Sequence, residues 1–556
     1  MKVRQTRYLG AHTRIYNYFM RMKNFCFMTS VPKTASLLFM SLFVVSCLED
    51  LSNLDKIGKI RLEPAVAFPL IGSDFTFEEF LKKGQTQGYV TNVNGLVVLT
   101  YKDTIVSPTA ETFFSVPDQQ SPNMSISGSS VIFPTPGSSV TVNQSTTFAI
   151  TPSQSEQLDS IVLKAGQLLV NIQSSISASV SLTLTVPSLK KGSALFQQTF
   201  TFTGNTSLHP AFDIGGYHVD LTESGTTTNT ILFSIKAVIT DTGQPIGNTS
   251  SLDVDFQLSG LKFSALFGQL GTTVFQTAAK AMNTDIFDNV KSGTVSLQSP
   301  SVEIRVDNSF GLPVSLDIRQ MKAVKSDGST IALSGAAVSA PSNPYLITAP
   351  GTPGSNANTT FSLTSANSNI SQIASSLPHD LVYQFSGQLN PGNAPKNFVL
   401  DISRLMIGVD FQLPLYGQLS GLAMSKTYDF NGIGIDNLEK SVITVKTINE
   451  FPLDAYLQVY FVNRTGATVD SLFADNKVLI KAAPVDGNGI STSPSEVLKQ
   501  VTLDKNRIDK INTASFLVVG ASINTTNNGT VPVKITFDSK LKVNVGANTH
   551  VQYSLH

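Results

Sequence analysis

Apolar and polar residues alternate along most of the chain after residue 50, in short runs rich in Val, Thr, Ile and Ser. Residues 180–186 (VSLTLTV) and 302–306 (VEIRV) place an apolar side chain at every second position. Because successive side chains of a strand point to opposite faces of a sheet, this period predicts strands with one buried face. The sequence therefore predicts an all-β fold of tandem sandwich-like modules, with short helices only at residues 75–83, 273–282, 369–376 and 504–512.

Related segments recur at a spacing of about 140 to 150 residues. Residues 308–318 align without a gap on residues 449–459, residues 267–270 match 416–419, and Asp288-Asn289 match Asp436-Asn437. A fainter third copy covers residues 172–184. The same landmarks occur in the same order, which predicts an internal repeat of β modules.

In each of the two clearer copies, a turn-forming element follows an alternating strand. Asn308, Gly311 and Pro313 fit poorly in a central ladder, so they predict a bulge or bend, with Phe310 or Phe451 in the core at the corner. The Asn-x-Phe-x-Leu element resembles the water-stress and late-embryogenesis β-sandwich family. The resemblance implies immunoglobulin-like sandwiches of about a hundred or more residues.

An apolar run of a different kind covers residues 34–45, ends at Val44-Val45-Ser46-Cys47 and is followed by Leu48-Glu49-Asp50. Seven basic residues and no acidic residue precede Cys47. A basic segment, an apolar stretch of this length and a small residue before the cleavage site are typical of a secretory signal. The run is too short to span a bilayer, and no apolar run after Cys47 approaches that length.

The segment from Val44 to Cys47 resembles a bacterial lipoprotein signal, although Val44 stands where that family more usually has Leu. The resemblance implies cleavage between Ser46 and Cys47, lipid on the sulfur and amino group of Cys47, and attachment to a membrane. Leu48-Glu49-Asp50 resembles the acidic tract that directs some Bacteroidota lipoproteins to the outer face of the outer membrane. The expected location is therefore the cell envelope, as an outer-membrane lipoprotein, with the periplasmic and extracellular faces both left open.

The start of translation also stays open between Met1, Met20, Met22 and Met28. The layout as a whole resembles large envelope lipoproteins of the Bacteroidota, in which a lipid signal precedes repeated β modules. That likeness implies no particular activity. We divide the chain into a signal peptide (1–46), a tether with an N-terminal β module (47–152), two repeat units (153–325 and 326–464) and a C-terminal β segment (465–556), and expect elongated modules.

Composition narrows the classes of function. Without the seven basic residues before Cys47, the chain has 32 basic and 39 acidic residues, so a nucleic-acid partner is not expected. The two cysteines are Cys26, in the leader, and Cys47, so the mature chain has no free thiol for a disulfide, a metal or a nucleophile. Only 14% of residues are charged, and hydroxyl side chains are expected to keep the exposed sheet faces soluble.

We find no catalytic constellation and expect no enzyme activity, cofactor or metal. His209, Asp213 and His218 have intervals that fit no standard metal motif, so they are interpreted as surface residues. His379-Asp380 lacks a placed nucleophile. The Asp-Gly segments at Asp327 and Asp486 lack the closing Glu of a calcium loop and predict hairpin turns.

The aromatic residues leave two interpretations open. The chain has 34 Phe, 13 Tyr and no Trp, and the Phe side chains either fill cores or line an apolar groove, for which Phe256, Phe263, Phe267 and Phe275 are the candidates. The leading hypothesis is a non-enzymatic, lipid-anchored envelope protein with a structural or interaction role, as a spacer or adhesin. The alternatives are a carrier of a lipid or other hydrophobic ligand and a surface glycan-binding protein, so the expected partners are the membrane and a protein, glycan or hydrophobic molecule.

Overall fold

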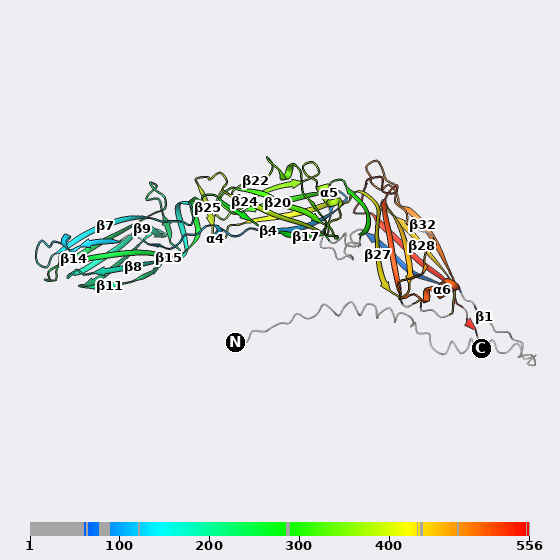
Figure 1. Ribbon diagram of the computed structural model, residues 1–556, viewed down its shortest axis with the longest axis horizontal. Helices are drawn as coiled ribbons and strands as arrows, with labels where there is room; N and C mark the ends of the chain where they lie inside the picture. The colour runs from blue at the N-terminus through cyan, green and yellow to red at the C-terminus, as the bar shows by residue number, and fades with distance from the viewer. Residues whose placement is uncertain are drawn as a thin grey trace, which may run out of the picture. The chain divides into compact units, whose positions relative to one another are not determined.

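A computed structural model describes residues 61–62, 65–76, 89–120, 123–284, 290–430, 432–433, 437–474, 478–551 and 553–554. Residues 65–550 form one compact unit. In a separate unit, the strand β1 (Arg61–Leu62) pairs antiparallel with β36 (Tyr553–Ser554). The compact unit is almost entirely β, which confirms the predicted fold class, and its strands form three sandwiches that we name A, B and C (Figure 1).

Sandwich A is built from strands β5 to β15. One layer pairs β15 with β8, β5 and β6, and pairs β8 with β11 and β12; the other has the order β7-β14-β9-β10. Strand β13 pairs with both β8 and β9 and so joins the layers. The strands are β5 (Gln119–Gln120), β6 (Met124–Ser127), β7 (Ser139–Ala149), β8 (Gln157–Ser174), β9 (Ser179–Lys191), β10 (Ala194–Thr203), β11 (Thr206–Leu208), β12 (Ala211–Asp213), β13 (His218–Asp220), β14 (Thr230–Thr240) and β15 (Ser251–Gln269).

Sandwich B has a sheet with the order β23-β19-β26-β4-β3 and a sheet with the order β16-β24-β20-β21, to which β17 and β22 add. Its strands are β3 (Tyr89–Val93), β4 (Leu96–Val106), β16 (Thr273–Gln276), β17 (Lys280–Asn283), β19 (Ser301–Asn308), β20 (Val314–Val324), β21 (Thr330–Ala332), β22 (Tyr345–Ile347), β23 (Ala357–Leu363), β24 (Asp380–Leu389) and β26 (Leu405–Pro414). The segment before β26 forms β25 (Asn397–Leu400), which pairs with β15 of sandwich A.

Sandwich C has sheets with the orders β2-β35-β28-β32 and β18-β27-β33-β29-β30, to which β31 and β34 add. Its strands are β2 (Ala65–Thr76), β18 (Val290–Leu297), β27 (Tyr416–Asp429), β28 (Leu438–Asn449), β29 (Leu453–Val462), β30 (Thr468–Ser471), β31 (Val478–Ile480), β32 (Ser495–Asp504), β33 (Phe516–Thr525), β34 (Val533–Lys534) and β35 (Lys540–Val551).

The three sandwiches share one topology. The order β32-β28-β35-β2 in sandwich C corresponds to β23-β19-β26-β4 in B, and β27-β33-β29-β30 corresponds to β16-β24-β20-β21. In sandwich A the equivalent central pairs are β8 with β15 and β9 with β14. This correspondence confirms the predicted internal repeat, including its fainter third copy in sandwich A.

The copies are nested in the chain. After β2, the first strand of sandwich C, the chain forms β3 and β4 of sandwich B, then all of sandwich A, then the rest of B and finally the rest of C. Sandwich A is thus inserted between β4 and β16 of sandwich B, and sandwich B with its insertion follows β2 of sandwich C. Strand β18 departs from this order, because it leaves sandwich B between β17 and β19 to pair with β27 of C. In Figure 1 the N-terminal strand β4 accordingly lies among strands from much later in the chain.

Strand pairing crosses the ranges into which the sequence was divided. Strand β7 lies before residue 152 and pairs with β14, which lies after it. Strand β4 pairs with β26, about 300 residues further along the chain. Chain order and sheet order differ because antiparallel sheets can combine strands that are distant in the sequence.

The repeated Asn marks the point where the chain passes from one sheet of a sandwich to the other. Asn308 ends β19, donates from Nδ2 to the carbonyls of Leu312 (3.0 Å) and Thr348 (2.9 Å), and accepts from the backbone N of Phe310 (2.9 Å). Asn449 repeats these bonds at the end of β28, with the carbonyls of Leu453 and Lys481 and the backbone N of Phe451.

Both Asn side chains are buried, and Phe310 beside the first is fully buried. In sandwich A, Ser174 takes the equivalent place and accepts from the backbone N of Ile176 (3.3 Å). The predicted bend is therefore a buried corner, at which an amide or hydroxyl side chain satisfies backbone groups that leave the ladder.

Two of the predicted helices are confirmed. They are α5 (Ile370–Ser375) and α6 (Lys505–Asn512), whose N-cap Asp504 accepts from the backbone N of Arg507 (3.0 Å). A short α4 (Ala110–Phe113) and the 3-10 turns η3 (Gly128–Ser130) and η5 (Ala336–Val338) were not predicted. None of the described helices is long and apolar enough to cross a membrane.

The predicted helix at 273–282 is wrong, because this segment forms β16 and β17. Its Ala-rich composition favours a helix, but both strands pair with β24 and bury Phe275 and Met282. Tertiary pairing overrides local propensity here. Of the predicted helix at 75–83, Phe75 and Thr76 belong to β2, and the remainder lies outside the described residues.

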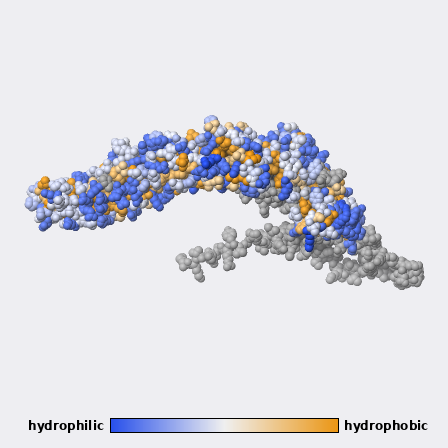
Figure 2. Space-filling view, viewed as in Figure 1, coloured by the Kyte–Doolittle hydropathy of each residue, from blue (hydrophilic) through white to orange (hydrophobic). Residues whose placement is uncertain are grey.

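Inward side chains of sandwiches A and B form one hydrophobic core, in which Leu182, Phe233, Ile304, Phe385 and Val409 are fully buried. The outward positions of sandwich A carry hydroxyls, as predicted. Cross-strand pairs join Ser139 to Thr240 (2.8 Å), Ser145 to Ser234 (2.8 Å) and Thr183 to Thr199 (3.1 Å). Hydrophilic residues cover most of the face of this sandwich that Figure 2 shows.

Candidate functional site

The predicted lipidation residue Cys47 and the cleavage residue Ser46 lie outside the described residues. The same is true of Asp288-Asn289 and of Asp436. Lipidation at Cys47 therefore stays a prediction from the sequence.

The four Phe residues nominated for an apolar groove occupy different places. Phe256 is buried in sandwich A and stacks on Phe233, with 4.5 Å between ring centroids. Phe263 belongs to the same hydrophobic core. Phe267 is partly exposed and lies 6.4 Å from Phe398 of β25, and Phe275 is buried against Phe113. The structure thus places Phe256, Phe263 and Phe275 in core packing.

The histidines and acidic turns have local partners. His209 lies 3.0 Å from the hydroxyl of Ser207, and Asp213 accepts from the backbone N of Gly215. No group of three or more His, Cys, Asp or Glu side chains that could hold a metal ion occurs among the described residues. His379 Nε2 lies 3.9 Å from the carboxylate of Asp380.

The two Asp-Gly segments are turns, as predicted. Asp327 accepts from the hydroxyl and backbone N of Ser329 in the connection between β20 and β21. Asp486 accepts from the backbone N of Ile490 and of Asn488. These hydrogen bonds stabilise the charged form and lower the pKa of both carboxyl groups.

A polar cluster that the sequence did not predict joins the two sheets of sandwich B. The carboxylate of Asp103, on β4, accepts from Lys280 Nζ on β17 (2.5 Å) and from the hydroxyl of Tyr383 on β24 (2.6 Å). Burial raises the pKa of Asp103, but the bonds from Lys280 and Tyr383 outweigh it, so the pKa lies below its usual value. Burial, together with this carboxylate, raises the pKa of the fully buried Tyr383. Since every group has a partner, the cluster acts as a structural tie.

A second ionic cluster lies where sandwich A meets sandwich B. Lys164 Nζ, on β8, lies 2.5 Å from a carboxylate oxygen of Asp401 and 3.4 Å from one of Glu111, on α4. Together with the pairing of β15 with β25, this cluster holds the two sandwiches in contact. Side-chain hydrogen bonding and attraction from Asp401 raise the pKa of Lys164.

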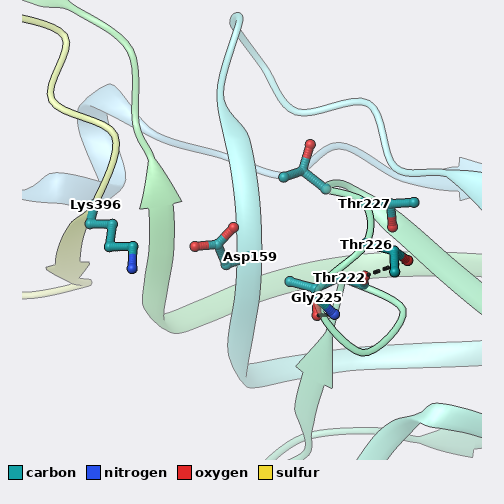
Figure 3. Close-up of a pocket in the computed structure, with 7 residues that line it drawn as sticks. Asp159, Thr222, Gly225, Thr226, Thr227 and Lys396 are labelled. Atoms are coloured by element: carbon teal, nitrogen blue, oxygen red, sulfur yellow. Dashed lines mark hydrogen bonds between the residues drawn. The ribbon is translucent and has the colours of Figure 1, made fainter.

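A polar pocket of about 610 Å³ lies beside the pairing of β15 with β25. Asp159 comes from β8, Lys396 from the residue before β25, and the remaining lining residues from the loop 222–228. Figure 3 shows Asp159 between Lys396 on one side and the loop with Thr222, Gly225 and Thr226 on the other. The loop folds back on Thr222, whose carbonyl accepts from the backbone N of Gly225, Thr226 and Thr227.

The pocket combines groups from distant parts of the chain, so no local pattern could predict it. Asp159 and Lys396 are 237 positions apart, and no motif joins them. A second hollow, of about 670 Å³, lies over Gly387 on the sheet of sandwich B and is bordered by Phe275, Asp317 and Pro344. In that hollow the carboxylate of Asp317 already accepts hydrogen bonds from Asn343 and Ser386.

Comparisons with known proteins give only faint likenesses. No family model matches the chain, and no curated protein matches it. A protein from Parabacteroides distasonis that is described as secreted has 13% identity and a TM-score of 0.23, covering 52% of this chain and 89% of its own. The VP2 subviral particle of infectious bursal disease virus has 8% identity and a TM-score of 0.13, covering 83% and 82%. At such TM-scores these likenesses identify neither a family nor a function for this chain.

Proposed function

We propose that this chain is a lipid-anchored protein of the cell envelope with a non-enzymatic structural or interaction role. The observation that carries the proposal is the sequence from residue 34 to Asp50, in which an apolar run ends at Ser46-Cys47 and acidic residues follow. A single acyl chain gives marginal membrane binding at about 0.8 kcal/mol per buried methylene, so a lipoprotein's several chains would hold the protein firmly.

The fold is compatible with such a role. The three sandwiches share one topology, and the outward face of sandwich A carries hydroxyl pairs between neighbouring strands. The nested connections leave sandwich A joined to the rest of the chain only through sandwich B. Because the anchor would lie just before sandwich C, sandwich A is the module farthest from it along these connections. We propose that sandwich A presents the contact surface.

The anchor is tested by Cys47→Ala. We expect this variant to incorporate no labelled palmitate and to leave the membrane fraction. Cys26→Ala is the matched control, since it removes the other cysteine of the chain and leaves the signal intact. Membrane retention and labelling of Cys47→Ala equal to those of Cys26→Ala would refute the anchor. Protease treatment of intact cells then distinguishes an extracellular from a periplasmic location.

A further inference from the structure

The polar pocket between Asp159, Lys396 and the loop 222–228 contains side chains without a partner in the protein. Asp159, Lys396, Thr227 and Thr228 make no side-chain hydrogen bond or ion pair with any residue that the structure describes. The contrast with the nearby Lys164 is direct, because its ammonium is engaged by two carboxylates. The pocket therefore keeps one anion, one cation and two hydroxyls available for a ligand.

The donors and acceptors of these groups restrict the ligand. A carboxylate only accepts, an ammonium only donates, and a Thr hydroxyl does both. A hydroxyl group on a ligand can also donate and accept. Neighbouring ligand hydroxyls can therefore donate to Asp159 and accept from Lys396. With Thr227 and Thr228 they can act as donor or as acceptor. A small zwitterion would match the two charged groups only, and it would have to lose more hydration to do so.

We infer that this pocket binds a neutral saccharide unit through its hydroxyl groups. The opposite charges of Asp159 and Lys396 balance one another, which favours an uncharged ligand over an anion or a cation. The lining residues include no aromatic ring on which a sugar could stack, so binding to one unit is weak, with a dissociation constant on the order of millimolar. The inference is independent of the lipid anchor, since residues of sandwiches A and B alone carry it.

The test uses the full-length processed protein in a polyoxyethylene detergent, because glycoside detergents would compete for the pocket. Saturation-transfer NMR is recorded with methyl glucoside, methyl mannoside and N-acetylglucosamine, and separately with glycine. We expect transfer to the protons of at least one neutral sugar. Asp159→Asn and Lys396→Gln should each weaken that binding about tenfold, since each removes a hydrogen bond to a charged group.

Matched controls are Asp538→Asn and Lys262→Gln, which change exposed residues outside the pocket and should leave binding unchanged. The pocket variants should unfold at the wild-type temperature, because the replaced groups have no internal partner. Thr228→Val offers a further variant that keeps both charges and should also weaken binding. Absence of transfer to every neutral sugar, equal binding by wild type and pocket variants, or transfer to glycine alone would overturn the inference.

Discussion

At the scale of single residues, the buried corner shows how one side chain fixes the path of the backbone. Asn308 and Asn449 each offer two donors and an acceptor to backbone groups that no ladder satisfies. Leaving such groups unpaired costs about 1–3 kcal/mol each. The pattern Asn-x-Phe therefore recurs for a direct physical reason. The bend that it marks could be predicted without a structure.

Asn308→Asp is expected to lower the free energy of unfolding by at least about 2 kcal/mol, because an acceptor oxygen would then face the carbonyls of Leu312 and Thr348 in a buried site. Urea unfolding followed by tyrosine fluorescence measures the change. The control is Asn143→Asp, on the exposed face of β7. Equal unfolding midpoints for the two variants would show that the corner amide does not stabilise the fold.

At the scale of elements, the repeated pair of an aromatic residue and Gly marks a close approach of strands. Phe267-Gly268 lies at the end of β15 and Tyr416-Gly417 at the start of β27, and each pairs with a short strand, β25 or β34. A Cβ on Gly268 would collide with the backbone of Gln157, and one on Gly417 with the backbone of Ser296. The two segments match in sequence because both positions must lack a Cβ to let the neighbouring strand approach.

Gly417→Ala is expected to cost about 1–3 kcal/mol and to separate β18 from β27, since the strand must shift to make room for the methyl group. Hydrogen exchange should show faster exchange of amides in β18, together with a lower melting temperature. Gly392→Ala is the matched substitution, because a Cβ at that position meets open space. Unchanged protection of β18 in Gly417→Ala would contradict the assigned close contact.

At the scale of the whole molecule, nesting brings together the two ends of the segment that forms sandwich A. The carboxylate of Asp118, just before β5, accepts from the hydroxyl of Ser259 (2.8 Å) and from the backbone N of Gly260 (2.7 Å). The two points at which the chain enters and leaves this part of sandwich A are therefore neighbours. Phe113, before the insertion, likewise packs against Phe275, after it.

Replacing residues 119–259 by a short Gly-Ser linker should leave sandwiches B and C folded, because the linker needs to span only the gap between Asp118 and Gly260. We expect a soluble product with one cooperative unfolding transition, measured by size-exclusion chromatography and calorimetry. A deletion of the same length, residues 153–293, removes strands from all three sandwiches and should be insoluble. The nested connectivity fails this test if the first product aggregates or the second folds.

The sequence by itself determined the features that depend on neighbouring residues. Alternation at period two predicted the β class, residues 504–512 were predicted as the helix that is α6, and the matching segments around Asn308 and Asn449 predicted the repeat. The candidate anchor at Cys47 also comes from local pattern alone. Each of these signals lies within about a dozen residues, where steric and hydrogen-bonding preferences act directly.

Only the tertiary structure decided which strands pair. The alternation of apolar and polar residues predicts that β4 has a buried face. It does not predict that the partner of β4 is β26, about 300 residues further along the chain. The strands β16 and β17 have a helix-like composition and become strands through pairing with β24. The polar pocket exists because β15 pairs with both β25 and β8, so that Lys396 and Asp159 line the same hollow. Such contacts follow from packing the whole chain, since no local energy specifies a partner at that distance.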